Sequence, residues 1–110
     1  MAYDEGLAEL LRGDLAEFGT IEERRMFGGL CFMKDGHMLC GVHKGGGMFR
    51  VGKSRHSQAL KIDGTSPMAF TGRPMGGLVD VTDEALADDA RRSALMALAL
   101  ANVADLPPRV

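Results

Sequence analysis

Two cysteines and two methionines stand where a β-hairpin would bring their sulfur atoms together. Asp35-Gly36 is typical of a two-residue type I′ turn, because glycine tolerates the positive φ angle that this turn requires. If the residues flanking the turn pair with each other, Met33 faces Met38 and Cys31 faces Cys40. Side chains alternate between the two faces of a strand, so all four are predicted to share one face.

This predicted sulfur face has two interpretations. Thiols and thioethers are soft ligands that suit a copper(I)-type ion, and the opposed pair Cys31 and Cys40 could instead form a cross-strand disulfide. However, the next turn places Val42, Phe49 and Val51 on the same face, which is typical of a hydrophobic core filled by adaptable sulfur side chains. The core interpretation is favoured, and the soft-metal or redox site stays as the alternative.

Residues 47–54 match the phosphate-binding pattern G-x-x-x-x-G-K-[ST] letter by letter. That mechanism needs a loop whose N–H groups surround a phosphate, whereas the four intervening residues, Met-Phe-Arg-Val, are typical of a strand. Nucleotide hydrolysis is therefore not expected. A weaker prediction is an anion contact at Lys53, Ser54 and Arg55, where a short helix is expected to begin.

No catalytic arrangement is visible in the sequence. His37, His43 and His56 lack metal-ligand spacing, and no serine or cysteine has a spacing that suggests a neighbouring base. We therefore expect a protein that is not an enzyme and that has no cofactor.

Apolar periodicity and turn residues predict the elements that would carry these side chains. Helices are expected over residues 7–18, 54–62 and 82–104, and strands over 24–34, 37–43, 48–52, 67–71 and 78–81. The order α-β-β-β-α-β-β-α predicts a single α+β domain over residues 1–110, with two layers, a mostly antiparallel sheet and helices on one face.

The composition fits a globular protein of 110 residues, with 45% apolar and 25% charged residues. The longest apolar run, residues 94–101, is too short to cross a membrane, and the acidic N-terminus does not resemble a signal peptide. Two cysteines in a chain that can build a core favour a reducing compartment, so we expect a cytoplasmic protein without membrane contact.

The net charge of −2 conceals an uneven distribution along the chain. Residues 1–23 hold seven acidic residues and one basic residue, and residues 80–110 hold six acidic and three basic residues. Residues 24–79 hold nine basic and two acidic residues. The predicted sheet is therefore basic, whereas the first and last helices are acidic.

The last predicted helix carries a stripe of small residues. Ala87, Ala90, Ala94, Ala97 and Ala101 are surrounded by leucines and a methionine, so the apolar perimeter is wide. This pattern predicts burial on two sides, one against the sheet and the other against a partner or a second copy of the chain. A homodimer is therefore an expectation.

Five segments resemble the N-terminal domain of the TfoX/Sxy competence regulators, in particular its short stand-alone bacterial versions. They are R-M-F-G-G-L (25–30), D-G-H-M (35–38), R-V-G (50–52), P-M-A-F-T-G-R-P-M-G-G (67–77) and L-P-P (106–108). The resemblance implies a two-layer α/β domain of order α-β3-α-β2-α. It also implies that Gly28-Gly29 lies within one bent strand and not at a hairpin.

The resemblance implies a regulatory function. Full-length members support expression of DNA-uptake genes, are thought to work with the cyclic AMP receptor protein, and carry a second domain that this chain lacks. Leu78 and Asp80 depart from the aromatic residues common in the short relatives, so the partner of this strand is expected to differ.

We therefore expect a small regulatory or protein-interaction domain whose partner belongs to the transcriptional machinery. Its alternative is a module that binds nucleic acid through the basic sheet face. The candidate partner or anion contacts are basic or polar side chains of the predicted sheet and short helix, namely Arg24, Arg25, Arg50, Lys53, Ser54, Arg55 and Arg73.

Overall fold

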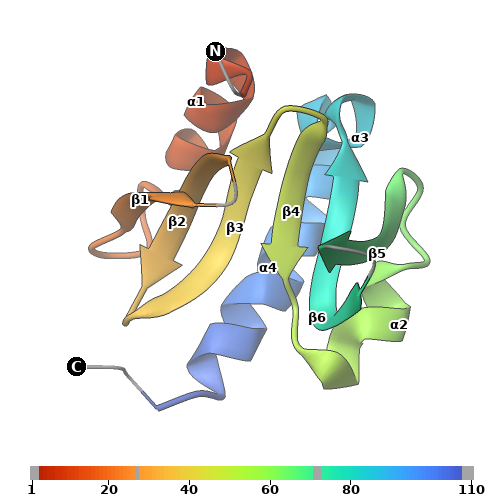
Figure 1. The fold of residues 1–110 in the computed structure, drawn as a ribbon. Helices are drawn as coiled ribbons and strands as arrows, with labels where there is room; N and C mark the ends of the chain where they lie inside the picture. The colour runs from red at the N-terminus through yellow and green to blue at the C-terminus, as the bar shows by residue number, and fades with distance from the viewer. Residues whose placement is uncertain (1–2, 27, 71–72, 108–110) are drawn as a thin grey trace.

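Six antiparallel strands form one sheet in the order β1-β2-β3-β4-β6-β5 (Figure 1). The computed structural model describes residues 3–26, 28–70 and 73–107, without the side chains of 69, 70 and 73–75. The strands are β1 (Glu22–Met26), β2 (Gly29–Lys34), β3 (His37–His43), β4 (Gly46–Arg50), β5 (Thr65–Phe70) and β6 (Arg73–Thr82). The predicted α+β class and antiparallel sheet are confirmed.

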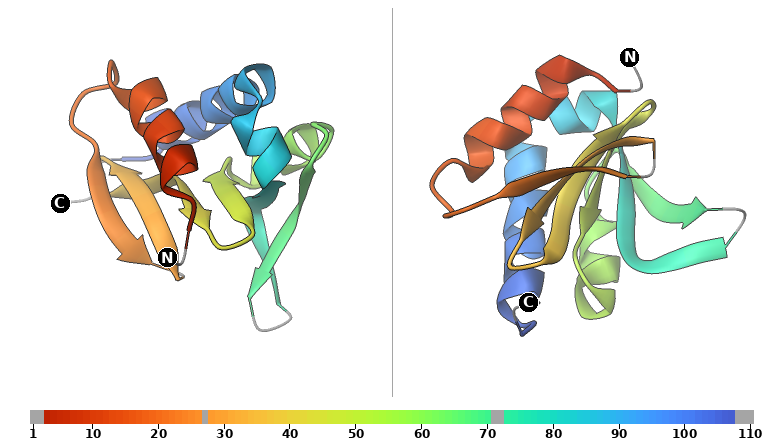
Figure 2. Two further views of the ribbon diagram at one scale, coloured as in Figure 1. Left: turned by 90° about the horizontal axis from the view of Figure 1, so that it is seen from above. Right: turned by 60° about the vertical axis from the view of Figure 1, so that its left-hand side comes forward.

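The helices cover one face of this sheet (Figures 1 and 2). They are α1 (Glu5–Leu15), the 3-10 helix η1 (Lys53–Arg55), α2 (His56–Ala59), α3 (Asp83–Ala87) and α4 (Asp89–Ala104). Each α-helix contributes to one main core, for example through Leu11, Ala59, Leu86 and Leu95, which are all fully buried. The helical spacing of apolar residues that predicted the first and last helices is therefore the spacing of the residues that these helices bury in the core.

The described members of a second buried cluster all lie in strands. We call it the methionine cluster, and its members are Cys31, Met33, Met38, Met48, Met68 and Leu78, with Met26 packed against it. Met48 and Leu78 belong to this cluster, whereas their chain neighbours Phe49 and Val79 belong to the main core. Since neighbouring residues of a strand point to opposite faces, the methionine cluster lies on the face of the sheet that carries no described helix.

The Gly28-Gly29 pair marks a hairpin, which corrects the single bent strand implied by the resemblance. β1 and β2 pair antiparallel from Glu22 with Met33 to Met26 with Gly29. Gly28 has a φ angle of 73°, which suits the tight turn between the two strands. The sheet therefore has six strands, one more than the sequence predicted.

A β-bulge changes the predicted register of the sulfur side chains. Met33 pairs with Met38 as expected, but the register shifts between Phe32 and Met33, so Cys31 pairs with Gly41 and Phe32 pairs with Cys40. Cys40 therefore lies in the main core and Cys31 in the methionine cluster. The prediction that Cys31 and Cys40 face each other is wrong, because one extra residue reverses the side-chain alternation.

Three boundaries also differ from the prediction. Arg73–Gly77, expected as a connecting loop, belongs to β6. The short helix has Gly52 at its N-cap without a side-chain cap, so Ser54 does not cap it. The last helix is divided at Asp88, whose extended backbone ends α3 and whose carboxylate accepts the N–H of Arg91 at the start of α4.

None of the helices in the described part of the chain is long and apolar enough to cross a membrane.

Candidate functional site

The candidate site lies on the face of the sheet that carries the methionine cluster. Arg24 of β1 pairs with Cys31 of β2, and cross-strand partners point to the same side, so Arg24 lies on this face. Its Nε donates to Glu22 Oε1 at 2.7 Å, and the side chain is 54% exposed. The arginine is therefore accessible, with part of its charge compensated.

Arg50 and Lys53 lie where β4 leaves the sheet. Arg50 pairs with Leu78 of β6, a member of the methionine cluster, and is half-buried. Lys53 is exposed and extends along β6, since a Cβ atom at Gly76 would lie 3.3 Å from Lys53 Cε. Neither cation forms an ion pair with a carboxylate in the described residues. Both cations therefore lie on the β4–β6 side of the cluster.

The other predicted contacts do not join this group. Arg25 pairs with Leu30 and therefore points to the helical side of β1, and Ser54 is exposed on η1. Arg55 donates to Asp105 at 2.7 Å, which fixes η1 to the end of α4. The backbone of Arg73 lies in β6, and its side chain falls outside the described part of the structure.

The phosphate-loop pattern does not form a phosphate cradle. Residues 46–50 form β4, which pairs with β3 on one side and with β6 on the other. The N–H groups of Val51 and Gly52 both donate to the carbonyl of Gly77, at 2.8 and 3.2 Å. The Arg55 N–H donates to the carbonyl of Gly52 at 3.2 Å, so these three backbone groups are already used within the fold and do not form a phosphate-binding loop.

Sequence reasoning missed a histidine–aspartate pair on the same face. His43 Nε2 lies 2.6 Å from Asp80 Oδ1, and the Gly45 N–H donates to His43 Nδ1 at 3.1 Å. Because Nδ1 accepts the Gly45 N–H, Nε2 is the ring nitrogen that faces the Asp80 carboxylate, so both ring nitrogens already have partners within the protein. The pairing of β4 with both β3 and β6 brings His43 of β3 close to Asp80 of β6, and no local spacing in the sequence could reveal this contact.

The described residues hold no group of three histidines, cysteines, aspartates or glutamates that could bind a metal ion. His37 is buried, and its Nε2 lies 2.7 Å from the carbonyl of Pro107, so this ring holds the C-terminal segment against the hairpin turn. His56 is half-buried in α2. The three histidines therefore lie apart.

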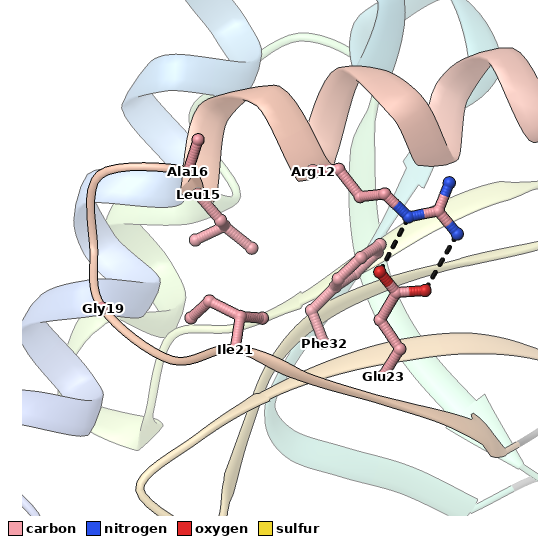
Figure 3. Close-up of a pocket in the computed structure, with 7 residues that line it drawn as sticks. All are labelled: Arg12, Leu15, Ala16, Gly19, Ile21, Glu23 and Phe32. Carbon is pink, nitrogen blue, oxygen red and sulfur yellow. Dashed lines mark hydrogen bonds and ion pairs between the residues drawn. The ribbon is translucent and has the colours of Figure 1, made fainter.

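A hollow of about 200 Å³ lies between α1 and β1 (Figure 3). Leu15, Ile21 and Phe32 line its apolar part, and the ion pair of Arg12 with Glu23 lies at one side. Arg12 donates to Glu23 through two nitrogens, at 2.7 and 2.8 Å, and also contacts two glutamates of α1.

These contacts decide what the hollow between α1 and β1 can bind. Hydrogen bonds to Glu23 and to the α1 glutamates raise the pKa of Arg12, and the hydrogen bond from Arg12 lowers the pKa of Glu23. Because three carboxylates already surround the guanidinium, Arg12 is not available to an anionic ligand. The ion pair instead attaches α1 to β1.

A second hollow, of about 230 Å³, lies between the end of α1 and α4. Phe18, Met96, Ala97 and Leu100 are among its lining residues. Phe18 is 42% exposed, which makes this an apolar part of the helical surface.

The fold and the surface define a small α+β domain whose sheet has one helix-covered face and one face with a sulfur-rich cluster and accessible basic side chains. The family model described as the TfoX N-terminal domain matches residues 14–103. The chain belongs to this family, which confirms the resemblance. Comparisons with curated proteins and with solved structures find no match.

Proposed function

We propose that this chain is a non-enzymatic regulatory domain that binds a protein of the transcriptional machinery. Membership of the TfoX N-terminal domain family is the observation that carries this proposal. The binding surface is the sheet face with the methionine cluster, and its principal contacts are Arg24, Arg50 and Lys53.

The distribution of ion pairs supports this choice of surface. On the helical side, the guanidinium of Arg12 contacts glutamates, and that of Arg92 contacts Asp14 and Asp89. On the opposite face, Arg50 and Lys53 have no carboxylate partner among the described residues. A partner that presents carboxylates would therefore gain most from contact with this face.

Nucleic acid is the competing class of partner. The chain has a sequence pI near 5.9, and two of the bases of its basic segment, Arg24 and Arg55, already contact carboxylates. Non-specific binding to DNA depends on many phosphate contacts and falls steeply with salt. The few free cations on the proposed face favour a protein partner over a phosphate backbone.

Binding to purified components tests the proposal. The immobilised chain is exposed to the cyclic AMP receptor protein and to RNA polymerase holoenzyme from the source cell, and to duplex DNA at two salt concentrations. We expect saturable binding to a protein component that is lost in the double variant Arg50→Glu/Lys53→Glu. Lys61→Glu is the matched control, because this lysine is exposed and its charge also changes sign.

Two outcomes would overturn the proposal. The first is protein binding that survives the double variant but is lost in the control, because the surface would then lie elsewhere. The second is salt-sensitive binding to DNA without binding to either protein component, which would make the domain a nucleic-acid module.

A further inference from the structure

We propose that the methionine cluster binds one soft monovalent metal ion of the copper(I) class. This proposal is independent of the proposed regulatory function. It rests on where the fold places the sulfur atoms. Among the side chains that the structure describes, the cluster holds Cys31 and four buried methionines, whereas the much larger main core includes only Cys40 and Met96 as sulfur-bearing members.

The register places the first three sulfur ligands on two adjacent strands. Met33 pairs with Met38 across the β2–β3 hairpin, and Cys31 lies two residues before Met33 on the same face of β2. Opposite side chains in such a pair have their Cβ atoms about 5 Å apart, and flexible methionine side chains can close the remaining distance.

Gly41 provides the space for a fourth ligand. It lies between Cys31 of β2 and Met48 of β4 in the register of the sheet. A Cβ atom at Gly41 would lie 2.9 Å from the terminal methyl of Met48 and 3.2 Å from the Cα of Cys31. The Met48 thioether therefore extends over Gly41 toward Cys31, and Met68 of β5 joins the same cluster.

The surroundings select a soft cation over a hard one. The carboxylates placed on this face include Glu22 and Asp80, and they are engaged by Arg24 at 2.7 Å and by His43 at 2.6 Å. Thiolate and thioether sulfur favour copper(I), whereas magnesium and calcium require oxygen ligands. Cys31 and Met48 are fully buried, while Met33 and Met38 reach the surface slightly, so an ion would enter past the two methionines.

Binding is a ligand exchange without oxidation or reduction. The Cys31 thiol loses its proton, its sulfur donates an electron pair to the ion, and one proton is released to solvent. The thioethers donate electron pairs and release nothing.

Silver(I) is the probe, because it has the same charge and ligand preference as copper(I) and needs no reductant. The full chain is titrated with silver nitrate in chloride-free buffer and followed by calorimetry and native mass spectrometry. We expect one ion per chain, with release of about one proton, obtained from the dependence of the heat on the buffer. Circular dichroism should stay that of the folded protein.

Three variants assign the site. Cys31→Ser and the double variant Met33→Leu/Met38→Leu should lose stoichiometric binding, and Cys40→Ser should keep it. The leucine substitutions preserve volume, so they should leave the fold intact. Cys31→Ala repeats the test if the serine variant does not fold.

Several outcomes would overturn the proposal. They are the absence of binding to the native chain, binding that is unchanged in Cys31→Ser and Cys31→Ala, binding that requires Cys40, and binding that occurs only as the protein unfolds. None of these outcomes bears on the regulatory proposal, which is tested with protein partners and surface charges.

Discussion

The buried guanidinium of Arg92 joins α4 to α1 through the carboxylate of Asp14. Arg92 is 5% exposed, and its Nε donates to Asp14 Oδ2 at 2.6 Å. It also donates to the carbonyl of Leu86 and to Asp89. We expect Asp14→Ala to lower the free energy of unfolding by about 2–4 kcal/mol, because a buried cation loses a partner.

Urea unfolding of two further variants separates this effect from lost packing. Arg92→Met removes the charge and keeps most of the volume, so it should cost less than Asp14→Ala. Glu17→Ala is the control, because Glu17 is exposed just after the end of α1, and this substitution should change the free energy of unfolding little. Equal losses in all three variants would contradict a specific role for the pair.

Glycine at position 29 is required by close contact with β3. A Cβ atom there would lie 1.9 Å from the carbonyl oxygen of Val42, so Gly29→Ala forces the strands apart. We expect a loss of at least about 2 kcal/mol, the range of severe overpacking. Gly13 offers the matched control, since it lies in α1 with open space around it. Gly13→Ala should stabilise by about 0.5–1 kcal/mol, and thermal melting measures both changes.

Much of the fold follows from local patterns in the sequence. The Asp35-Gly36 turn, the bounds of β3, the Thr82 cap at α3 and the helical period of α1 all depend on neighbouring residues. These features could be predicted because their stabilising contacts lie within a few positions of the chain.

The features that escaped prediction depend on long-range packing. The bulge between Phe32 and Met33 allows Leu39 and Cys40 to enter the main core together, and it separates the two cysteines. The pair of His43 with Asp80 depends on the register of β4 against β6. Neither pattern has a local sequence signal, so the candidate site could be predicted only as a basic sheet face.

The ion pair of Arg12 with Glu23 predicts a specific dependence of stability on pH. The hydrogen bond from Arg12 lowers the pKa of Glu23 below that of an ordinary glutamate, so the pair stabilises the fold at pH values above the ordinary glutamate pKa. As the pH falls through the lowered pKa, the carboxylate takes up a proton and this stability is lost. Because both side chains are about one third exposed, we expect about 0.5–1 kcal/mol.

Glu23→Gln tests this assignment by thermal melting at neutral and acidic pH. The variant should melt below the wild type at neutral pH, and the difference should close as the pH falls through the lowered pKa of Glu23. Glu17→Gln is the control, as an exposed glutamate outside the ion pairs of the described residues. A difference between Glu23→Gln and wild type that does not depend on pH would rule out the pair as its cause.

The two cysteines should behave as separate thiols that are alkylated slowly in the metal-free folded protein. Both are free and fully buried, and burial raises the pKa of each, to about 11 for Cys31. Because the thiolate is the reactive form, alkylation at pH 8 should be slow in the native protein and fast in guanidinium chloride. The rate for Cys31 should increase as the pH rises.

Treatment with diamide followed by intact-mass measurement checks the pairing. We expect no intramolecular disulfide, since Cys31 and Cys40 lie on opposite faces of the sheet. Rapid loss of two hydrogens per native chain would contradict this arrangement and restore the cross-strand redox pair.

The outer surface of α4 leads to a last prediction, that two copies associate through this helix. Residues 93–104 contain no charged residue, and Ala90, Ala94, Ala97 and Ala104 are exposed, at successive spacings of four, three and seven positions. Small residues in such an arrangement permit close approach of two helices, and Phe18 adds apolar area beside Ala97.

We therefore expect the chain to self-associate in a concentration-dependent way. Ala97→Glu should favour the monomer, because association would bury an unpaired charge. Ala87→Glu is the control on α3. Light scattering during gel filtration measures the mass, and a wild type that stays monomeric at every accessible concentration would refute the prediction.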